Sequence, residues 1–332
     1  MKLKIIVPFS FLLFISLSCS HPLQQIIQKT PDYEKQRLEI LEEVQRSVLR
    51  ITCSAYYDNF YYAKPKENAA SLELEELLIK KESTTNSVAG TGLVVSQNSQ
   101  FNLLLSCFHL FDFQDTVKTY YSSNEGIPTN NLLSLSIKKG QVIYITHKNS
   151  KRTLGRIIAK DNKNDIALIE TETLQSILLE KACNGSFGKD NELKFGKEVY
   201  LIGFPKGFLF VTRGLISPSP YKNKFLIDAS FNRGFSGGAV IAINKNNGTY
   251  RYFGMANSMA YDSQFVLTPS EQAINLKYFE NLPYLDNAYV KELKLVNVGL
   301  TFAVKSSVIR RFLNNERGSL RLKGHYLPEE FK

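Results

Sequence analysis

The sequence predicts an all-β protein, a barrel or a sandwich, preceded by a helix. From residue 88 to about residue 256, short apolar runs follow one another with turn residues between them, which is typical of such folds. Apolar residues at helical spacing occur ahead of this region. With 43% hydrophobic and 22% charged residues, the 332-residue chain has the composition of a folded protein with a large core.

Residues 1–18 are predicted to be an export signal. Two lysines precede an apolar run that ends at Ser18 and is too short to span a membrane comfortably. The ending Ser16-Leu17-Ser18-Cys19 resembles a bacterial lipoprotein signal, although that signal usually has Leu where Ser16 stands. The resemblance implies a lipid on Cys19 and an exported protein anchored on a membrane of the cell envelope. An ordinary secretory signal, giving a periplasmic or secreted protein, is the alternative.

The first element of the mature chain is predicted to be a helix over Pro31–Val48. Leu41, Val44 and Val48 recur at spacings of three and four, and the proline at the start suits a helix N-terminus. Residues 19–46 are therefore expected to hold a tether and this helix.

Strands follow from Ser47–Thr52 onward, with an excursion expected over residues 57–86 that includes a short helix at Ser71–Lys80. Asn244–Gly248 is predicted to be a hairpin turn. The other predicted strands are Gly92–Ser96, Phe101–Ser106, Gln141–His147, Leu154–Ala159, Asp165–Glu170, Glu198–Gly203, Val211–Ser217, Phe225–Asp228, Ala239–Ile243 and Tyr250–Ala256.

Charge and cysteine content exclude several classes of function. The net charge is +10, but the lysines and arginines are scattered and form none of the dense runs typical of nucleic-acid binding. The four cysteines and four histidines have no zinc-binding spacing, and there is no glycine-rich nucleotide loop. We therefore expect no nucleic acid, no metal and no cofactor. Cys107 stands in an apolar run and is interpreted as a buried residue, not a nucleophile.

Three short motifs suggest nucleophilic catalysis. Ser236 lies in Gly234-Phe235-Ser236-Gly237-Gly238, which suits a hydroxyl on a tight turn. His109 follows an apolar strand, and Asp165 heads another. Each alone has a structural interpretation: a glycine-rich turn, a structural histidine or a strand cap. Together they occur in the order His, Asp, Ser, which is the chain order of chymotrypsin-like enzymes.

Five further segments strengthen the pattern, and with the three motifs they make the chain resemble trypsin-like serine proteases of the HtrA type over roughly residues 47–314. They are Val88–Val95, Val199–Gly207, Val211–Ser217, Asp228–Gly234 and Asn297–Val304.

The resemblance implies a double six-stranded β-barrel, with a first barrel over about residues 47–180 and a second over about 190–305. A terminal helix is expected at Ser306–Asn314 and a tail over 315–332. The implied activity is cleavage of protein or peptide substrates without a cofactor.

The resemblance also implies roles for individual residues. Ser236 would attack the scissile carbonyl, His109 would act as general base, and Asp165 would orient His109. The backbone N–H groups of Gly234 and Ser236 would form the oxyanion hole. Ser230 would lie at the base of the primary pocket, and because it is neutral, cleavage after small or medium apolar residues is expected.

Departures from the family keep a second hypothesis open. Phe235 stands where the family often has Asn, residues 259–295 look inserted, and too few residues follow Val304 for the PDZ domain that HtrA proteins usually carry. The alternative is an envelope lipoprotein that uses a protease-like fold for binding without catalysis.

Overall fold

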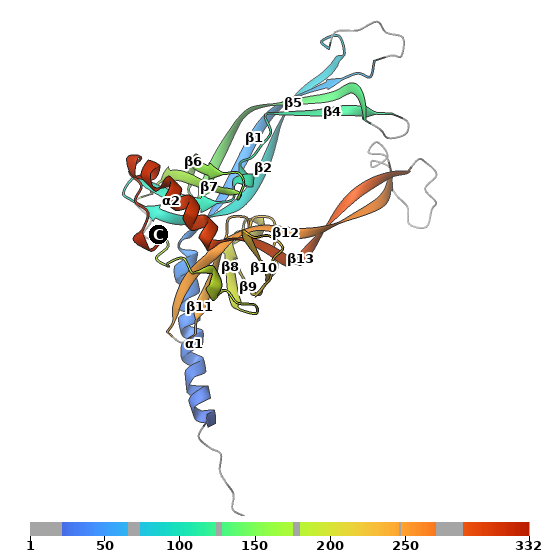
Figure 1. Cartoon of the computed structure of the whole chain (residues 1–332). Helices are drawn as coiled ribbons and strands as arrows, with labels where there is room; N and C mark the ends of the chain where they lie inside the picture. The colour runs from blue at the N-terminus through green and yellow to red at the C-terminus, as the bar shows by residue number, and fades with distance from the viewer. Residues whose placement is uncertain are drawn as a thin grey trace, which may run out of the picture.

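The computed structural model describes residues 22–65, 74–123, 128–174, 180–245, 247–269 and 288–331. It consists of two β-barrels with a helix at each end of the chain, and long hairpins project from both barrels (Figure 1). The predicted double barrel is therefore confirmed. The expected signal and Cys19 lie outside the described residues. No helix among the described residues is long and apolar enough to cross a membrane.

The first barrel contains six antiparallel strands and closes where its first strand pairs with β5. A seventh strand, β4 (Thr116–Ser122), extends the sheet from the outer part of β5. Around the barrel the strands are β1 (Val48–Tyr62), β2 (Leu78–Gln97), β3 (Phe101–Ser106), β7 (Ile166–Glu172), β6 (Arg152–Asp161) and β5 (Pro128–Thr146).

The second barrel also has six strands and closes through the pairing of β9 with β10. Its strands, in order around the barrel, are β10 (Lys224–Asp228), β13 (Ala288–Lys305), β12 (Thr249–Pro269), β11 (Ala239–Asn244), β8 (Glu198–Gly203) and β9 (Phe210–Ser217).

Each barrel is filled by aliphatic side chains from its shortest, most continuously apolar strands. Leu104 and Leu168 are fully buried in the first barrel, and Leu201 and Val240 are fully buried in the second. Burial of one such side chain contributes roughly 1.5–3 kcal/mol to folding. Since β3 and β7 are neighbours in this core, the chain segments that leave them are held at fixed positions at the barrel rim.

The excursion predicted over residues 57–86 is a long hairpin. The helix expected at Ser71–Lys80 is wrong for the part of this segment that the structure describes. β1 continues to Tyr62 and β2 begins at Leu78, so Leu78–Lys80 are in a strand that pairs back to β1. Residues 66–73 lie outside the described part of the chain. Cross-strand pairing overrides the helix preference of the Leu, Glu and Lys residues in this segment.

The apparent insertion at residues 259–295 has the same structural origin. β12 and β13 continue past the barrel and pair with each other as far as Pro269 and Ala288. The resulting ribbon projects beside the β1, β2, β4 and β5 extension in Figure 1.

Both helices differ in extent from the prediction. α1 (Pro22–Gln45) begins before Pro31, includes most of the expected tether and ends before Val48, which opens β1. α2 (Ser306–Leu322) runs beyond Asn314. The predicted tail over 315–332 is therefore wrong for residues 315–322, which continue the helix, and the residues that follow α2 contact the first barrel through Tyr326 and His325. His325 is buried against Glu170 of β7, and Phe331 is buried against Phe187, in the segment between the barrels.

Candidate active site

The structure brings His109, Asp165 and Ser236 together at the junction of the two barrels. His109 lies in a single turn of 3-10 helix, η1 (Phe108–Leu110), directly after β3. Asp165 lies in the turn that precedes β7. Because β3 and β7 are antiparallel neighbours, the end of one strand and the start of the other meet at the same rim. Ser236 comes from the loop between β10 and β11 in the second barrel.

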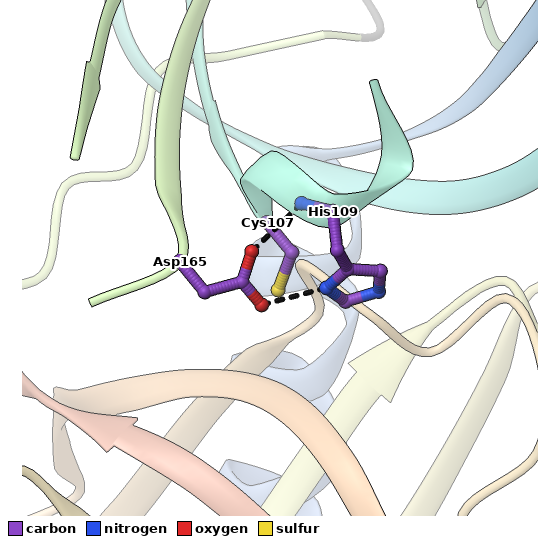
Figure 2. A group of neighbouring side chains, drawn as sticks. All are labelled: Cys107, His109 and Asp165. Atoms are coloured by element: carbon purple, nitrogen blue, oxygen red, sulfur yellow. Dashed lines mark hydrogen bonds and ion pairs between the residues drawn. The ribbon is translucent and has the colours of Figure 1, made fainter. Parts of the chain in front are cut away.

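A continuous chain of hydrogen bonds joins the three side chains. His109 Nδ1 lies 2.6 Å from Asp165 Oδ2, and the His109 backbone N–H donates to Asp165 Oδ1 over 2.7 Å (Figure 2). On the other side of the ring, His109 Nε2 lies 3.0 Å from Ser236 Oγ. An ionised carboxylate only accepts hydrogen bonds, so in the neutral ring Nδ1 carries the proton and Nε2 accepts from the Ser236 hydroxyl.

Asp165 is held as a carboxylate in an uncommon backbone conformation. Its φ is 57°, in the left-handed region that Asp tolerates better than most residues, and its carbonyl accepts the Phe108 N–H. Burial alone would raise the pKa of Asp165. The hydrogen bonds from the His109 ring and backbone and from Asn257 outweigh it and leave the pKa below the usual range.

Asn257 is a site residue that the sequence did not indicate. It follows Ala256, where the predicted strand ended, and the strand β12 in fact continues through it. Its side-chain amide donates to Asp165 Oδ2 over 2.6 Å, and its backbone carbonyl oxygen lies 3.3 Å from Ser236 Oγ, as an alternative acceptor for the hydroxyl proton. Lys224 in turn donates to the Asn257 side-chain oxygen. A polar residue directly after a buried apolar strand was the one available signal.

Cys107 lies beside the pair but is not positioned to act as a nucleophile. The prediction that it is buried is confirmed, since none of its surface is exposed. One ligand atom each from Cys107, His109 and Asp165 lies within 4.8 Å of the others, so the three could in principle hold a metal ion. Burial, with a smaller contribution from Asp165, raises the pKa of the Cys107 thiol well above its usual range. The thiol donates to the Ala256 carbonyl over 3.4 Å.

The loop that carries Ser236 requires glycine at two positions. Gly234 has a φ of 107°, and a Cβ there would lie 2.3 Å from the carbonyl oxygen of Phe204. Gly237 has a φ of 88°, and a Cβ there would lie 1.9 Å from the carbonyl oxygen of Thr91. An added side chain at either glycine would therefore displace the loop.

Contacts with both barrels fix the orientation of this loop. The Arg233 carbonyl accepts the Lys206 N–H over 2.9 Å. The Thr91 hydroxyl donates to the Gly234 carbonyl over 2.7 Å, and the Thr91 N–H donates to the Ser236 carbonyl over 2.8 Å. Across the described parts of the chain, the N–H groups of Gly234 and Ser236 donate to no backbone carbonyl.

A cavity of about 700 Å³ opens beside the Ser236 hydroxyl. Ser230, expected at the base of the primary pocket, is exposed and does not line this cavity, whereas its neighbour Phe231 does. The cavity wall combines cationic and apolar side chains, among them Arg50, Lys206, Arg233, Phe231 and Met259.

Two antiparallel barrels with a His–Asp pair from one and a serine from the other define the trypsin-like class of serine peptidase domains. Residues 90–247 match the family model described as the trypsin-like peptidase domain. The matched residues include His109, Asp165 and Ser236.

Similar proteins carry HtrA-type names. A protein named serine protease HtrA-like from Staphylococcus aureus (strain USA300) is 35% identical over 115 residues, which cover 29% of this chain and 14% of that protein. The protein of the same name from strain bovine RF122 / ET3-1 is 34% identical over the same shares. The similarity thus spans about one seventh of the length of these relatives. A solved structure of the HtrA-type protease AlgW with a tripeptide covers 86% of this chain and 63% of its own, with 13% identity and a TM-score of 0.44.

Proposed function

We propose that the protein is a serine endopeptidase that hydrolyses protein substrates through an acyl-enzyme intermediate. The observation that supports this most is the hydrogen-bonded series from Asp165 through His109 to Ser236, which ends at a cavity large enough for peptide side chains. Ser236 attacks the scissile carbonyl while His109 Nε2 takes the hydroxyl proton. His109 then gives this proton to the leaving amine, and a water molecule hydrolyses the acyl-enzyme by the same route.

Asp165 has the role of orienting and stabilising group in this proposal. Its carboxylate holds the Nδ1 proton and lowers the energy of the imidazolium that forms during attack. The lowered pKa of Asp165 supports the role, because a protonated carboxyl could not provide this stabilisation. Asn257 keeps the carboxylate in place through its own hydrogen bond.

The N–H groups of Gly234 and Ser236 are the proposed oxyanion hole. Two features support this: neither N–H donates to a backbone carbonyl within the described residues, and the Arg233 carbonyl is bonded to Lys206. In a trans peptide the N–H points opposite to the carbonyl, so the Gly234 N–H is directed away from Lys206. One such donor contributes on the order of 10²–10³ to the rate.

A serine-reactive fluorophosphonate probe tests the proposal against the alternative of a binding protein without catalysis. We expect the wild-type protein to be labelled on Ser236 and to degrade an unfolded protein substrate. Ser236→Ala should lose the label and lower the rate on the order of 10⁴–10⁶-fold. Ser263→Ala, on the exposed β12–β13 ribbon, is the matched control and should behave as wild type. A wild-type protein that neither labels nor cleaves would support the binding protein instead.

We propose further that the protein is exported and held on a membrane of the cell envelope by a lipid on Cys19. The support is the sequence alone: basic residues, a short apolar run and the Ser16–Cys19 ending. Cys19→Ser in the full chain should move the protein from the membrane fraction to the soluble fraction. Unchanged membrane association would contradict the lipid and favour an ordinary secretory signal or another mode of binding.

A further inference from the structure

The cavity beside Ser236 has a wall of three cationic side chains that no carboxylate neutralises. Arg50 comes from β1, Lys206 from the turn η3 (Pro205–Gly207), and Arg233 from the loop ahead of Gly234. None of the residues that line the cavity is Asp or Glu. In the part of the chain that the structure describes, none of the three forms an ion pair.

The three cations are tied to the loop that carries the nucleophile. The Lys206 N–H donates to the Arg233 carbonyl, and the next residue after Arg233 is Gly234. The Arg50 guanidinium packs against Gly207, where a Cβ would lie 3.1 Å from Arg50 Cζ. These contacts hold the segments that carry Arg50, Lys206 and Arg233 beside the loop of Ser236, and all four residues line the same cavity.

Two of the cations are held at a cost in free energy. The Arg50 Nε is buried and has no hydrogen-bond partner among the described residues. Lys206 has a φ of 50°, in the left-handed region that is unfavourable for a residue with a side chain. Unsatisfied donors and backbone strain beside a catalytic serine are typical of groups kept for a ligand.

The apolar part of the cavity wall strengthens an ion pair between the three cationic side chains and a bound anion. Val88, Leu110, Phe231 and Met259 contribute apolar surface, and such surface lowers the local dielectric constant. A guanidinium binds a carboxylate through two parallel hydrogen bonds, and an ammonium adds a third donor nearby. A carboxylate side chain therefore fits this wall better than a neutral or cationic one.

We propose that Arg50, Lys206 and Arg233 bind an acidic side chain of the substrate close to the scissile bond, so that the preferred substrates are acidic segments of proteins. This inference rests on the proposed peptidase activity. It replaces the neutral pocket expected from Ser230, which does not line the cavity.

The first experiment compares matched peptides that differ only by Glu or Gln at each of the four positions around the scissile bond. We expect kcat/KM to be at least about tenfold higher for Glu at one of these positions, since a charge-assisted hydrogen bond contributes at least that much. In Arg50→Gln/Lys206→Gln this ratio should fall toward 1, because two of the three cations are lost. Arg50→Lys, which keeps the charge but loses the paired geometry, should give an intermediate ratio.

Arg152→Gln is the control for net charge, because Arg152 is exposed on β6 and lies outside the cavity. It should keep the full preference for Glu. A ratio of 1 in the wild type would overturn the proposal, as would a preference that survives in the double variant or that Arg152→Gln removes equally.

A binding measurement separates failure of this inference from failure of the proposed function. The Ser236→Ala protein is titrated with the fluorescent Glu and Gln peptides, and the anisotropy gives the two affinities without any turnover. Tighter binding of the Glu peptide, lost in Arg50→Gln/Lys206→Gln on the same background, supports the acidic site even if the wild type proves inactive. Equal affinities beside normal cleavage would overturn the acidic site and leave the peptidase intact.

Discussion

Asn257 determines how firmly Asp165 holds its charge. Its amide donates to the same carboxylate oxygen that accepts the His109 Nδ1 proton. Asn257→Ala removes a bond that favours the ionised form, so the pKa of Asp165 should rise. The carboxylate would then take up a proton at higher pH and would orient His109 less firmly, so kcat/KM should fall, and the part of the acid-side loss that comes from protonation of Asp165 should move to higher pH.

The measurement is the pH profile of kcat/KM for the wild type and two variants. Asn257→Asp should move the acid side further than Asn257→Ala, because a second carboxylate next to Asp165 disfavours its charge. Asn149→Ala, in an exposed turn, should leave the profile unchanged. An unaltered profile in both Asn257 variants would show that this residue only fills space.

Gly234 allows a second prediction at a single residue. In Gly234→Ala the new Cβ would collide with the Phe204 carbonyl, and the positive φ would be strained. The loop should shift and lose one oxyanion donor, with a fall in the rate of labelling by a fluorophosphonate of about 10²–10³-fold.

Gly318→Ala is the matched control, because nothing lies within 4 Å of a Cβ at this position in α2. It should leave labelling unchanged and stabilise the protein by about 0.5–1 kcal/mol, since Ala is the better helix former. Normal labelling in Gly234→Ala would contradict the role given to its N–H.

Site residues that stand in a motif at the end of an apolar strand could be predicted from the sequence. Site residues that act through contacts with distant parts of the chain could not. His109, Asp165 and Ser236 each stand at a recognisable motif beside an apolar strand. Asn257 and Thr91 act on partners 92 and 143 residues away, respectively. Only the closed barrels create those contacts, so no local pattern shows which partners these two residues reach.

At the scale of elements, the C-terminal segment is part of the first barrel's structure. His325 Nε2 lies 2.6 Å from Glu170 Oε2 on β7, and Arg156 on β6 donates to the other oxygen of the same carboxylate. His325 and Glu170 are both buried. Burial would raise the pKa of Glu170, but the bonds from Arg156 and His325 outweigh it and lower the pKa.

This arrangement predicts a pH-dependent contribution to stability. The pKa of Glu170 is lower in the folded protein than in the unfolded chain, where it is about 4.3. The ionised carboxylate therefore stabilises the folded state at pH values above about 4.3, and this stabilisation is lost as the pH falls through the lower pKa of the folded protein. Glu170→Gln should therefore be less stable than wild type at pH 7, and the difference should shrink below about pH 4.3. Urea unfolding at both pH values measures it. Glu172→Gln, exposed at the end of the same strand, should show no such change. A constant difference would contradict the ion pairs.

The sequence pattern predicted the core strands but not the outer parts of the long strands. The core strands were predictable because their apolar runs are buried, as in β3 and β7. The outer parts of β2, β12 and β13 carry exposed residues such as Ile79 and Phe265, so burial imposes no alternation on them. Pairing with the neighbouring strand sets their conformation instead.

At the scale of the whole molecule, Thr91 connects the first barrel to the nucleophile loop of the second. Its hydroxyl donates to the Gly234 carbonyl and accepts the Phe204 N–H, and the residue is fully buried. Thr91→Val keeps the shape but leaves both groups unsatisfied, which costs about 1–3 kcal/mol for each. We expect a less stable protein with slower labelling at Ser236.

Thr91→Ser is the matched variant, because it retains the hydroxyl and should restore most of the labelling rate. Urea unfolding and fluorophosphonate labelling of the three proteins measure both effects. If Thr91→Val labels at the wild-type rate, the loop does not depend on this contact between the barrels.

The division of His109, Asp165 and Ser236 between two barrels also sets the time at which the protein can become reactive. During synthesis the base and the carboxylate emerge first, in a barrel that has no nucleophile of its own. The serine comes later, in a loop whose conformation depends on Thr91 of the barrel already made. Under the proposed mechanism, a half-made, truncated or half-unfolded chain should therefore be inert, and activity requires that both halves have folded and docked.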